Sequence, residues 1–456
     1  MLSNDLVNSV DIMLQDPKKA LIKMSIPLII SLLITSFYNL IDAAWVSGLG
    51  ADALAGVGFF TPIFMILVGF GNGLGSGAAF AISKYLGEDN KKKADNASVH
   101  SIFIDVIVSL IITVLALIFL NPILNVMGAG QTIGYATDYG VIILLGSIFI
   151  IFSNALYGIF RGEGDTTRPM YAMIASAILN MILDPIFIYT LNLGVRGAAI
   201  ATIISSIFVI LILLYWFYAK KDTYIKPNLS NFDFKGDISF DVVKVGIPAS
   251  IQLLNNAFFA AVFSALLTFV GSTDSVAVYS TGWRIVIIGT TPILAIGTAL
   301  ISVIAANYGA RNYMNIKIAH RYAMKVSIVL GIAVAILTNV FAGDIASVFT
   351  SSGSSVRIAP ELTAFLAWIV IYYPTMGVGV PSTYVFQGVG KGIAAMFQTI
   401  IRETGFTIFF AVLFGVVLGY GVWGAWMGIV LGEIVSNNLT MVWADYLIKK
   451  LIDIKG

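Results

Sequence analysis

Residues 206–218 read SIFVILILLYWFY, and residues 110–120 read LIITVLALIFL. Both runs are almost entirely apolar, and neither alternates apolar with polar residues as a membrane β-barrel strand does. In lipid, every backbone polar group must be satisfied within the protein, so runs of this kind form helices. The rest of the chain suits the same solvent: 58% of its 456 residues are hydrophobic, 11% are charged, and the mean hydropathy is +0.93. The sequence therefore predicts an all-α polytopic membrane protein.

Several function classes lack the residues that they need. The formal net charge of +2 disfavours a nucleic-acid partner, and the absence of cysteine excludes disulfides and thiolate metal sites. No GxxxxGK[ST] motif is present, so we expect no ATP-driven step, and no HExxH or GxSxG motif indicates an enzyme. His100 and His320 are isolated in the sequence, and we expect both near the cytoplasmic surface and neither at a metal. We expect no cofactor.

Twelve membrane spans are predicted, because a spanning helix needs about 20 mostly apolar residues. Those of the first half lie near 20–46, 56–84, 97–120, 133–158, 169–190 and 195–219. Those of the second half lie near 243–270, 276–307, 316–343, 359–385, 394–419 and 423–448. The resulting domains are an N-terminal segment 1–19, two lobes at 20–219 and 243–450, a polar linker 220–242 and a tail 451–456.

The N-terminal segment has no charged region followed by an apolar core, so we expect no cleaved signal peptide. Two interpretations of it stay open. It is either a plain cytoplasmic tail or a short interfacial helix with apolar residues on one side. Those residues are Leu6, Val7, Val10, Met13 and Leu14.

Lysine and arginine are concentrated in alternate loops. Cytoplasmic loops carry an excess of these residues, so the basic side predicts the cytoplasm. The opposite loops hold only Arg196 and Arg357. The basic side comprises Lys18, Lys19, Lys23, Lys84, Lys91, Lys92, Lys93, Arg161, Arg168, Lys220, Lys221, Lys226, Lys235, Arg311, Lys317, Arg321, Lys391, Lys449 and Lys450. Both termini and the linker are therefore predicted to be cytoplasmic.

The two halves resemble each other. IPLIISLL from Ile26 matches IPASIQLL from Ile247, RGEGDT from Arg161 matches QGVGKG from Gln387, and LGVRGAA from Leu193 matches YGVWGAW from Tyr420. Six spans per half give both copies the same orientation, so the repeats are parallel and related by an axis along the membrane normal. A duplicated bundle can exist for stability alone. We favour a transporter, because two pseudo-symmetric lobes form a central cleft that can serve as a substrate path between the halves.

Two acids lie within predicted spans of the first half, where charge is costly and marks function by default. At 1.5 Å per residue, Asp42 lies about 6 Å and Asp184 about 9 Å below the outer end of its span, and Thr202 about 10 Å below the start of its own. Tyr38 shares a helix face with Asp42, and Asn180 shares one with Asp184. These residues can be structural hydrogen-bonding groups. We favour a site for protons or sodium at Asp42, Asn180, Asp184 and Thr202.

The second half has no matching acids, so the predicted ion site is asymmetric. Its first span offers side chains that hydrogen-bond but do not titrate and that can line a substrate path, namely Gln252, Asn255 and Asn256. Glu403 follows Arg402, which favours local neutralisation, whereas Glu433 and Arg284 remain unexplained. Gly69, Gly73 and Gly77 have the spacing of close helix packing.

Pro27 favours a kink in the first span because proline removes a helical hydrogen bond. The kink is a candidate hinge that moves Asp42 relative to Asp184. A static bend is an equally good interpretation of the same residue.

The chain resembles the multidrug and toxic compound extrusion (MATE) family over essentially its whole length. The resemblance rests on RGEGDTTRPM from Arg161, NMILDPIFIY from Asn180, GVRGAAIATIIS from Gly194 and FYNLIDAAWVSGLGADALAGVG from Phe37. It implies twelve helices in two six-helix lobes arranged as a V. It also implies export of small organic, often cationic, compounds in exchange for H⁺ or Na⁺.

The family's first-lobe coupling site falls on Asp42, Asn180, Asp184 and Thr202, with Tyr38 and Tyr139 in its hydrogen-bond network. The lack of further acids in the seventh span is similar to the branch named for a DNA-damage-inducible protein. The resemblance implies a monomer in the cytoplasmic membrane of a prokaryote. The alternative function is a flippase of lipid-linked precursors, whose cavity needs several basic residues for phosphates. The predicted first-lobe interior has none, which favours drug export.

Overall fold

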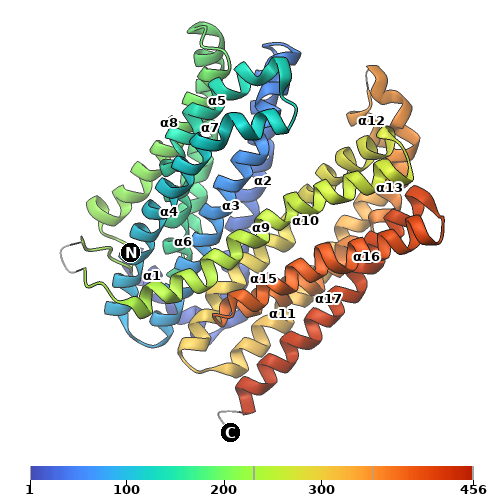
Figure 1. The fold of residues 1–456 in the computed structure, drawn as a ribbon. Coiled ribbons are helices and arrows are strands. Elements are labelled where there is room, and N and C mark those ends of the chain that lie inside the picture. Colours follow the sequence, from blue (N-terminus) through green and yellow to red (C-terminus); the bar gives the residue numbers. More distant parts are fainter. Residues whose placement is uncertain (1, 230–231, 352, 454–456) are drawn as a thin grey trace.

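The computed structural model describes residues 2–229, 232–351 and 353–453, and over these ranges it is helical, with no strand. Its long helices form two lobes that touch at the end carrying both termini and diverge at the other end, as a V (Figure 1). In the described residues, nine helices are long and apolar enough to cross a bilayer, and two bent helix pairs add two further spans. With α17 (Gly421–Asp453), the sixth helix of the second lobe, the predicted twelve spans are confirmed.

The predicted division into six helices per lobe agrees with the helix order along the chain. The first lobe contains α2 (Pro17–Ser47), α3 (Ala51–Gly87), α4 (Lys91–Val126), α5 with α6 (Ile133–Leu145, Ser147–Gly162), α7 with η2 (Thr167–Pro185, Ile186–Thr190) and α8 with η3 (Val195–Leu214, Tyr215–Lys220). The second lobe contains α9 (Gly236–Val270), α10 (Thr273–Gly309), α11 (Tyr313–Val340), α13 with α14 (Ala359–Ile369, Tyr372–Gly388), the run α15, η6, α16 and η7 (Gly392–Ile400, Ile401–Phe406, Thr407–Val412, Leu413–Val417) and α17. Short helices lie at α1 (Leu2–Gln15), η1 (Gly130–Thr132), α12 (Ala342–Phe349) and η5 (Gly353–Ile358).

The fourth span of each lobe is not straight. It bends by 50° between α5 and α6, and again by 50° between α13 and α14. At the first break, a side chain at Gly146 would collide with Ile203, since an ideal Cβ there lies 2.2 Å from that residue. At the second break, Pro374 has no N–H to donate to the carbonyl group four residues earlier, which lies at the bend.

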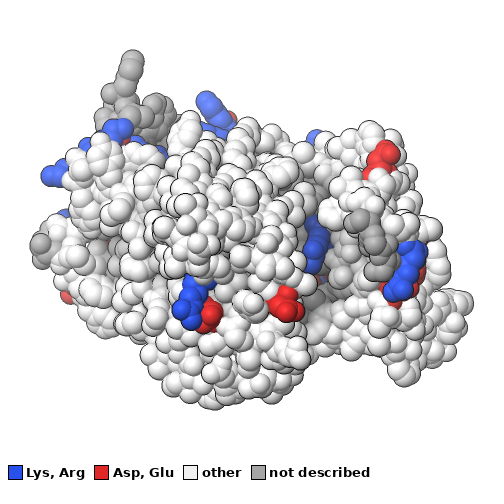
Figure 2. Space-filling model, turned by 90° about the horizontal axis from the view of Figure 1, so that it is seen from above, with Lys and Arg blue, Asp and Glu red and all other residues white. Residues whose placement is uncertain are grey.

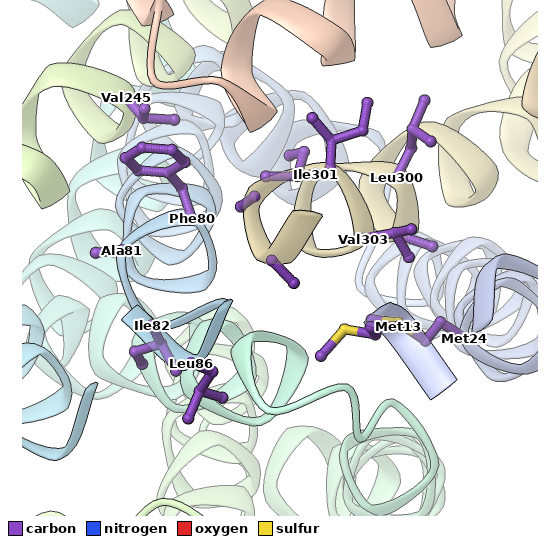
Figure 3. Packing of buried hydrophobic residues seen from close by; sticks show 14 of the residues in the cluster. Met13, Met24, Phe80, Ala81, Ile82, Leu86, Val245, Leu300, Ile301 and Val303 are labelled. Carbon is purple, nitrogen blue, oxygen red and sulfur yellow. The ribbon is translucent and has the colours of Figure 1, made fainter. Parts of the chain in front are cut away.

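Three apolar cores explain the V. One core lies in the outer part of the first lobe around Phe60 and Ile143, and a second lies in the second lobe around Phe365 and Trp426. The third joins the lobes near the termini (Figure 3), where Phe80 of α3 lies beside Val245 of α9, and Leu300 of α10 belongs to the same cluster. Outside these cores, large apolar side chains such as Ile118 are exposed, as expected for a protein whose solvent is lipid.

Glycines let the lobes approach closely, as the sequence spacing indicated. An ideal Cβ at Gly73 would lie 2.4 Å from the backbone N of Ser250 in α9, and one at Gly77 would lie 2.3 Å from the carbonyl oxygen of Val242. The second helix of the first lobe, α3, packs on the first helix of the second lobe, α9, and α10 packs on α2 in the same way. This reciprocal packing is the contact pattern expected of two parallel repeats.

The N-terminal segment is a helix, so the plain-tail interpretation is wrong for the described residues. In α1, Met13 is 1% exposed, and its carbonyl oxygen accepts a 2.8 Å hydrogen bond from Asn307 of the second lobe. Met13 also lies against Gly164 of the first lobe, so α1 covers the junction of the two lobes. The side chains of Leu6 and Val7 lie outside the described residues.

Helix α9 begins at Gly236 and α17 continues to Asp453, so both helices extend beyond the predicted spans. Residues 454–456 of the predicted tail lie outside the described residues. The linker is docked on the first lobe. Its Ile225 N–H donates to Glu163 at 2.8 Å, its Lys226 N–H donates to Asp95 at 2.9 Å, and its Lys235 N–H donates to His100 at 3.0 Å.

Candidate functional site

The predicted first-lobe cluster comes from four helices of one lobe. Asp42 and Tyr38 lie on α2, Asn180 and Asp184 on α7, Thr202 on α8 and Tyr139 on α5. Directly after Asp184, Pro185 ends the regular α-helix and the chain continues as the π-helical turn η2. Wide turns of this kind often occur at functional sites.

Asp184 is the buried centre of the cluster, with no exposed surface. In the amide orientation that satisfies both its groups, Asn180 donates to Asp184 Oδ2 at 2.8 Å and accepts from the Thr202 N–H at 3.3 Å. Asn180 therefore fixes one oxygen of Asp184 and ties α7 to α8.

Asp42 lies close to Asp184, near enough for each carboxyl group to act on the other. The Thr202 hydroxyl lies near Tyr38 and Tyr139 and donates to the Ala198 carbonyl at 3.0 Å. Among the described residues, Asp42 Oδ1 and Asp184 Oδ1 are buried and have no hydrogen-bond partner. Two neighbouring carboxyl groups repel when both are ionised, so this arrangement favours the uptake of a proton or a cation.

A cavity of about 160 Å³ borders the cluster. Tyr38, Asn180 and Thr202 contribute to its wall, together with Thr35, Ser205 and Ser206. The cluster therefore has a polar chamber beside it that is large enough for water or a small ligand group.

The second lobe contains an ion-pair network that accounts for two of the unassigned charges. Arg402, on the π-helical turn η6, donates to Glu403 at 2.7 Å and to Glu433 at 3.1 Å. The expected local neutralisation of Glu403 is confirmed, and Glu433 is its companion. Asn255 donates to the other oxygen of Glu403 at 3.0 Å.

A second cavity, of about 240 Å³, lies between the lobes. Of the residues that we expect along a substrate path, Gln252 and Asn256 line this cavity, whereas Asn255 is not among its lining residues. Both lobes also supply a basic residue to its wall, Arg161 from α6 and Arg402 from η6. The expectation that Arg161 lies in a cytoplasmic loop, away from the lobe interior, is therefore wrong.

Comparison with known proteins agrees with this architecture. The family model MatE matches residues 27–186 and again 248–413, one match in each lobe. The chain belongs to the MATE family. It is 28% identical to the multidrug export protein MepA of Staphylococcus haemolyticus over 93% of this chain and 92% of that protein. It is 26% identical to MepA of Staphylococcus aureus strain MRSA252 over 84% of both chains.

A solved structure extends the comparison to the fold. It is described as the outward-facing conformation of a multidrug resistance MATE family transporter of the MOP superfamily. Its TM-score is 0.94 with 36% identity, and the match covers 98% of this chain and 99% of that one. This chain is thus a MATE transporter of the membrane, and its two halves have the arrangement known for that family.

Sequence reasoning about this MATE protein missed Asp105. It lies within the apolar run IFIDVIVSL of α4, is 1% exposed, and neither of its carboxylate oxygens has a hydrogen-bond partner among the described residues. An acid inside an apolar helix is the signal that identified Asp42, so Asp105 was detectable in the same way. His100 and His320, which we expected near the cytoplasmic surface, are both buried, and His320 lies next to Ser382 at 3.0 Å.

Glu163, which joins α6 to α7 outside the spans, is a further buried acid. It has no exposed surface, Arg168 and Asp165 lie beside it, and burial is the main cause that raises its pKa to about 8. Burial keeps the folded pKa above that of the unfolded chain, although the Ile225 N–H bond by itself favours the carboxylate. The docked arrangement around Glu163 is therefore most stable below about pH 4.5 and loses stability as the pH rises to about 8.

We therefore expect the undocked fraction of linker residues 221–229 of this MATE transporter to rise roughly tenfold per pH unit between about pH 4.5 and about pH 8, and to level off above about pH 8. Glu163→Gln keeps an acceptor oxygen but does not titrate, so it should remove this dependence. Hydrogen exchange of the linker peptide, corrected for the intrinsic rate at each pH, measures the effect. Equal protection of the wild-type linker at about pH 6.5 and about pH 9 would contradict the prediction.

Proposed function

We propose that this MATE transporter exports drug-sized organic compounds in exchange for protons, and that Asp42 and Asp184 bind the exchanged proton. The observation that carries the proposal is the proximity of two carboxyl groups inside one lobe, each with a buried oxygen that lacks a partner among the described residues. One proton between them relieves their repulsion. Its release leaves two negative charges that push α2 away from α7.

Sodium is the competing coupling ion, since carboxylate, amide and hydroxyl oxygens all suit a hard cation. The cluster offers two unpartnered carboxylate oxygens, whereas the amide oxygen of Asn180 already accepts from Thr202. A sodium ion would have to displace that bond, so the geometry favours a proton. Sodium dependence without proton dependence would assign the site to the metal.

We further propose alternating access, in which the lobes rock about their common contact and α2 bends near Pro27. In support, the lobes are joined near the termini and diverge at the other end, where a hollow runs between them (Figure 2). The junction includes an ion pair across the lobes, in which Lys84 of α3 lies 2.7 Å from Asp241 of α9. Such contacts must break when the opposite side opens. The substrate then binds between the lobes of a single monomer.

Purified protein in proteoliposomes tests the proposal. Ethidium is loaded inside, and a proton gradient, a sodium gradient or neither is imposed across the membrane. We expect efflux that saturates with ethidium and follows the proton gradient in strict exchange. Efflux that neither gradient drives would reject coupled export, and non-saturating flux would indicate a channel.

The proposed orientation places both termini and the linker in the cytoplasm. The native chain contains no cysteine, so a single cysteine at Lys226, in the linker, reports its side of the membrane without background. We expect an impermeant maleimide to label it only after the cells are opened. Labelling in intact cells, at the level of a matched cysteine at Arg357 in the opposite loops, would reverse the orientation.

A further inference from the structure

Arg161 occupies an unusual place at the end of α6. Its side chain is only 9% exposed, yet it lines the cavity between the lobes. It reaches this position across α3 at Gly75, where an ideal Cβ would lie 3.1 Å from Arg161 Nη2. The absence of a side chain at Gly75 gives the guanidinium the room that it occupies.

The charge of Arg161 is not balanced by a carboxylate. Among the described residues it has no ion pair and no hydrogen bond, and its Nε atom is buried without an acceptor. Arg402, the other basic residue of this cavity, is held by Glu403 and Glu433. Of the two arginines in this wall, Arg402 is therefore neutralised by carboxylates, whereas the guanidinium of Arg161 has no such partner among the described residues.

Nearby unmatched groups are mostly hydrogen-bond donors. Gln252 Nε2 lacks an acceptor, although the carbonyl oxygen of the same side chain accepts from Gln387 at 3.1 Å. Arg402 Nε is likewise without an acceptor, and Gln387 Oε1 is the unmatched acceptor in the same wall. A buried guanidinium without a partner is costly, so the cavity suits a ligand that brings negatively charged oxygens.

We propose that Arg161 binds the carboxylate of the exported compound, so that the substrates include drug-sized organic acids and zwitterions. A planar guanidinium matches a carboxylate with two parallel hydrogen bonds, which adds specificity as well as attraction. The cavity of about 240 Å³ accommodates the acid-bearing end of such a molecule. This inference rests on the proposed export function, because it places the substrate between the lobes, and it departs from the expectation of mainly cationic compounds.

Two dyes that differ by one methyl group test the assignment. Rhodamine 110 carries a free carboxylate, and rhodamine 123 is its methyl ester. Equilibrium binding to the purified full-length protein, measured by fluorescence anisotropy in detergent, needs no gradient. A failure of coupled export therefore leaves this test intact, and a failure of this test leaves coupled export of the ester intact.

We expect Arg161→Gln to weaken binding of rhodamine 110 by about tenfold or more and to change binding of the ester by less than about twofold. Arg161→Lys keeps the charge but loses the planar fork, so its affinity for the acid should lie between those of wild type and Arg161→Gln. Arg321→Gln removes an exposed arginine that pairs with Asp445 outside the cavity, and it should bind both dyes as wild type does.

Equal losses for acid and ester in Arg161→Gln, or no loss for either, would overturn the assignment. Displacement of rhodamine 110 by a short-chain anionic phospholipid, but not by benzoate, would also overturn it, because Arg161 would then recognise lipid phosphate. If Arg161→Gln does not fold, the Arg161→Lys variant alone decides. An acid-to-ester affinity ratio equal to that of wild type in that variant rejects the proposal.

Discussion

Replacing Asp42 with Asn should reduce proton-driven ethidium export on the order of 100-fold. This factor corresponds to the upper end of typical coupling free energies between two binding sites. Asn keeps the shape of the side chain but cannot release a proton, so the repulsion between residues 42 and 184 never develops. Because an ion that binds both conformations equally shifts no population, the gradient then does no work. The measurement is the initial efflux rate against pH in proteoliposomes.

The matched control for this variant is Asp138→Asn. Asp138 is another acid of the first lobe, but it pairs with Arg196 at 2.7 Å and is exposed, so it should tolerate the same change. Asn256→Ala, in the wall of the cavity between the lobes, should alter ethidium affinity and leave the pH profile unchanged. An Asp42→Asn protein with the pH and sodium dependence of wild type would end the coupling role of Asp42.

Gly309→Val should prevent the lobes from closing at the end that carries the termini. An ideal Cβ at Gly309 lies 2.0 Å from the Lys84 carbonyl oxygen, and one at Gly87 lies 1.9 Å from the Ala306 carbonyl oxygen. The obstacle is backbone in each case, so no change of rotamer relieves it. Overpacking costs about 1–3 kcal/mol, which lowers the closed population about 5- to 150-fold.

Spin labels at Lys92 and Lys317, one on each lobe, report the closure as a distance. We expect this distance to lengthen in Gly309→Val, and export to fall in parallel. Gly134→Val is the matched control, because an added Cβ at Gly134 meets nothing within 4 Å. Wild-type distances in Gly309→Val would show that the α3–α10 contact is not required.

The spans and the lobes were predictable, because a helix that faces lipid must be apolar over its whole length and the repeat doubles the signal. The bends at Gly146 and Pro374 were not, because hydropathy is the same on both sides of a bend. Helix α1 was left undecided for a similar reason. Its burial depends on Asn307 and Gly164, which lie far away in the sequence.

The candidate site was predictable where depth alone brings residues together. Asp42, Asn180, Asp184 and Thr202 lie at similar depths on neighbouring helices, and this is sufficient to place them in one cluster. Arg161 was misjudged because its position near a span end favoured a loop, whereas Gly75 lets it reach inward. The pairing of Arg402 with Glu433 joins residues from two helices, and one sequence carries no signal for it.

The docked linker has a mechanical consequence. Its hydrogen bonds to Glu163, Asp95 and His100 attach it to the first lobe up to residue 235, and Lys93 holds Asp237 at 3.1 Å in the first turn of α9. Almost no slack chain therefore remains between the lobes. The covalent connection is therefore short and is fixed at the N-terminal end of α9. It permits the second lobe to rotate about this point but limits its separation from the first lobe. Cutting the chain at the linker should thus leave the lobes assembled, because the connection is held by the first lobe on both sides of the cut.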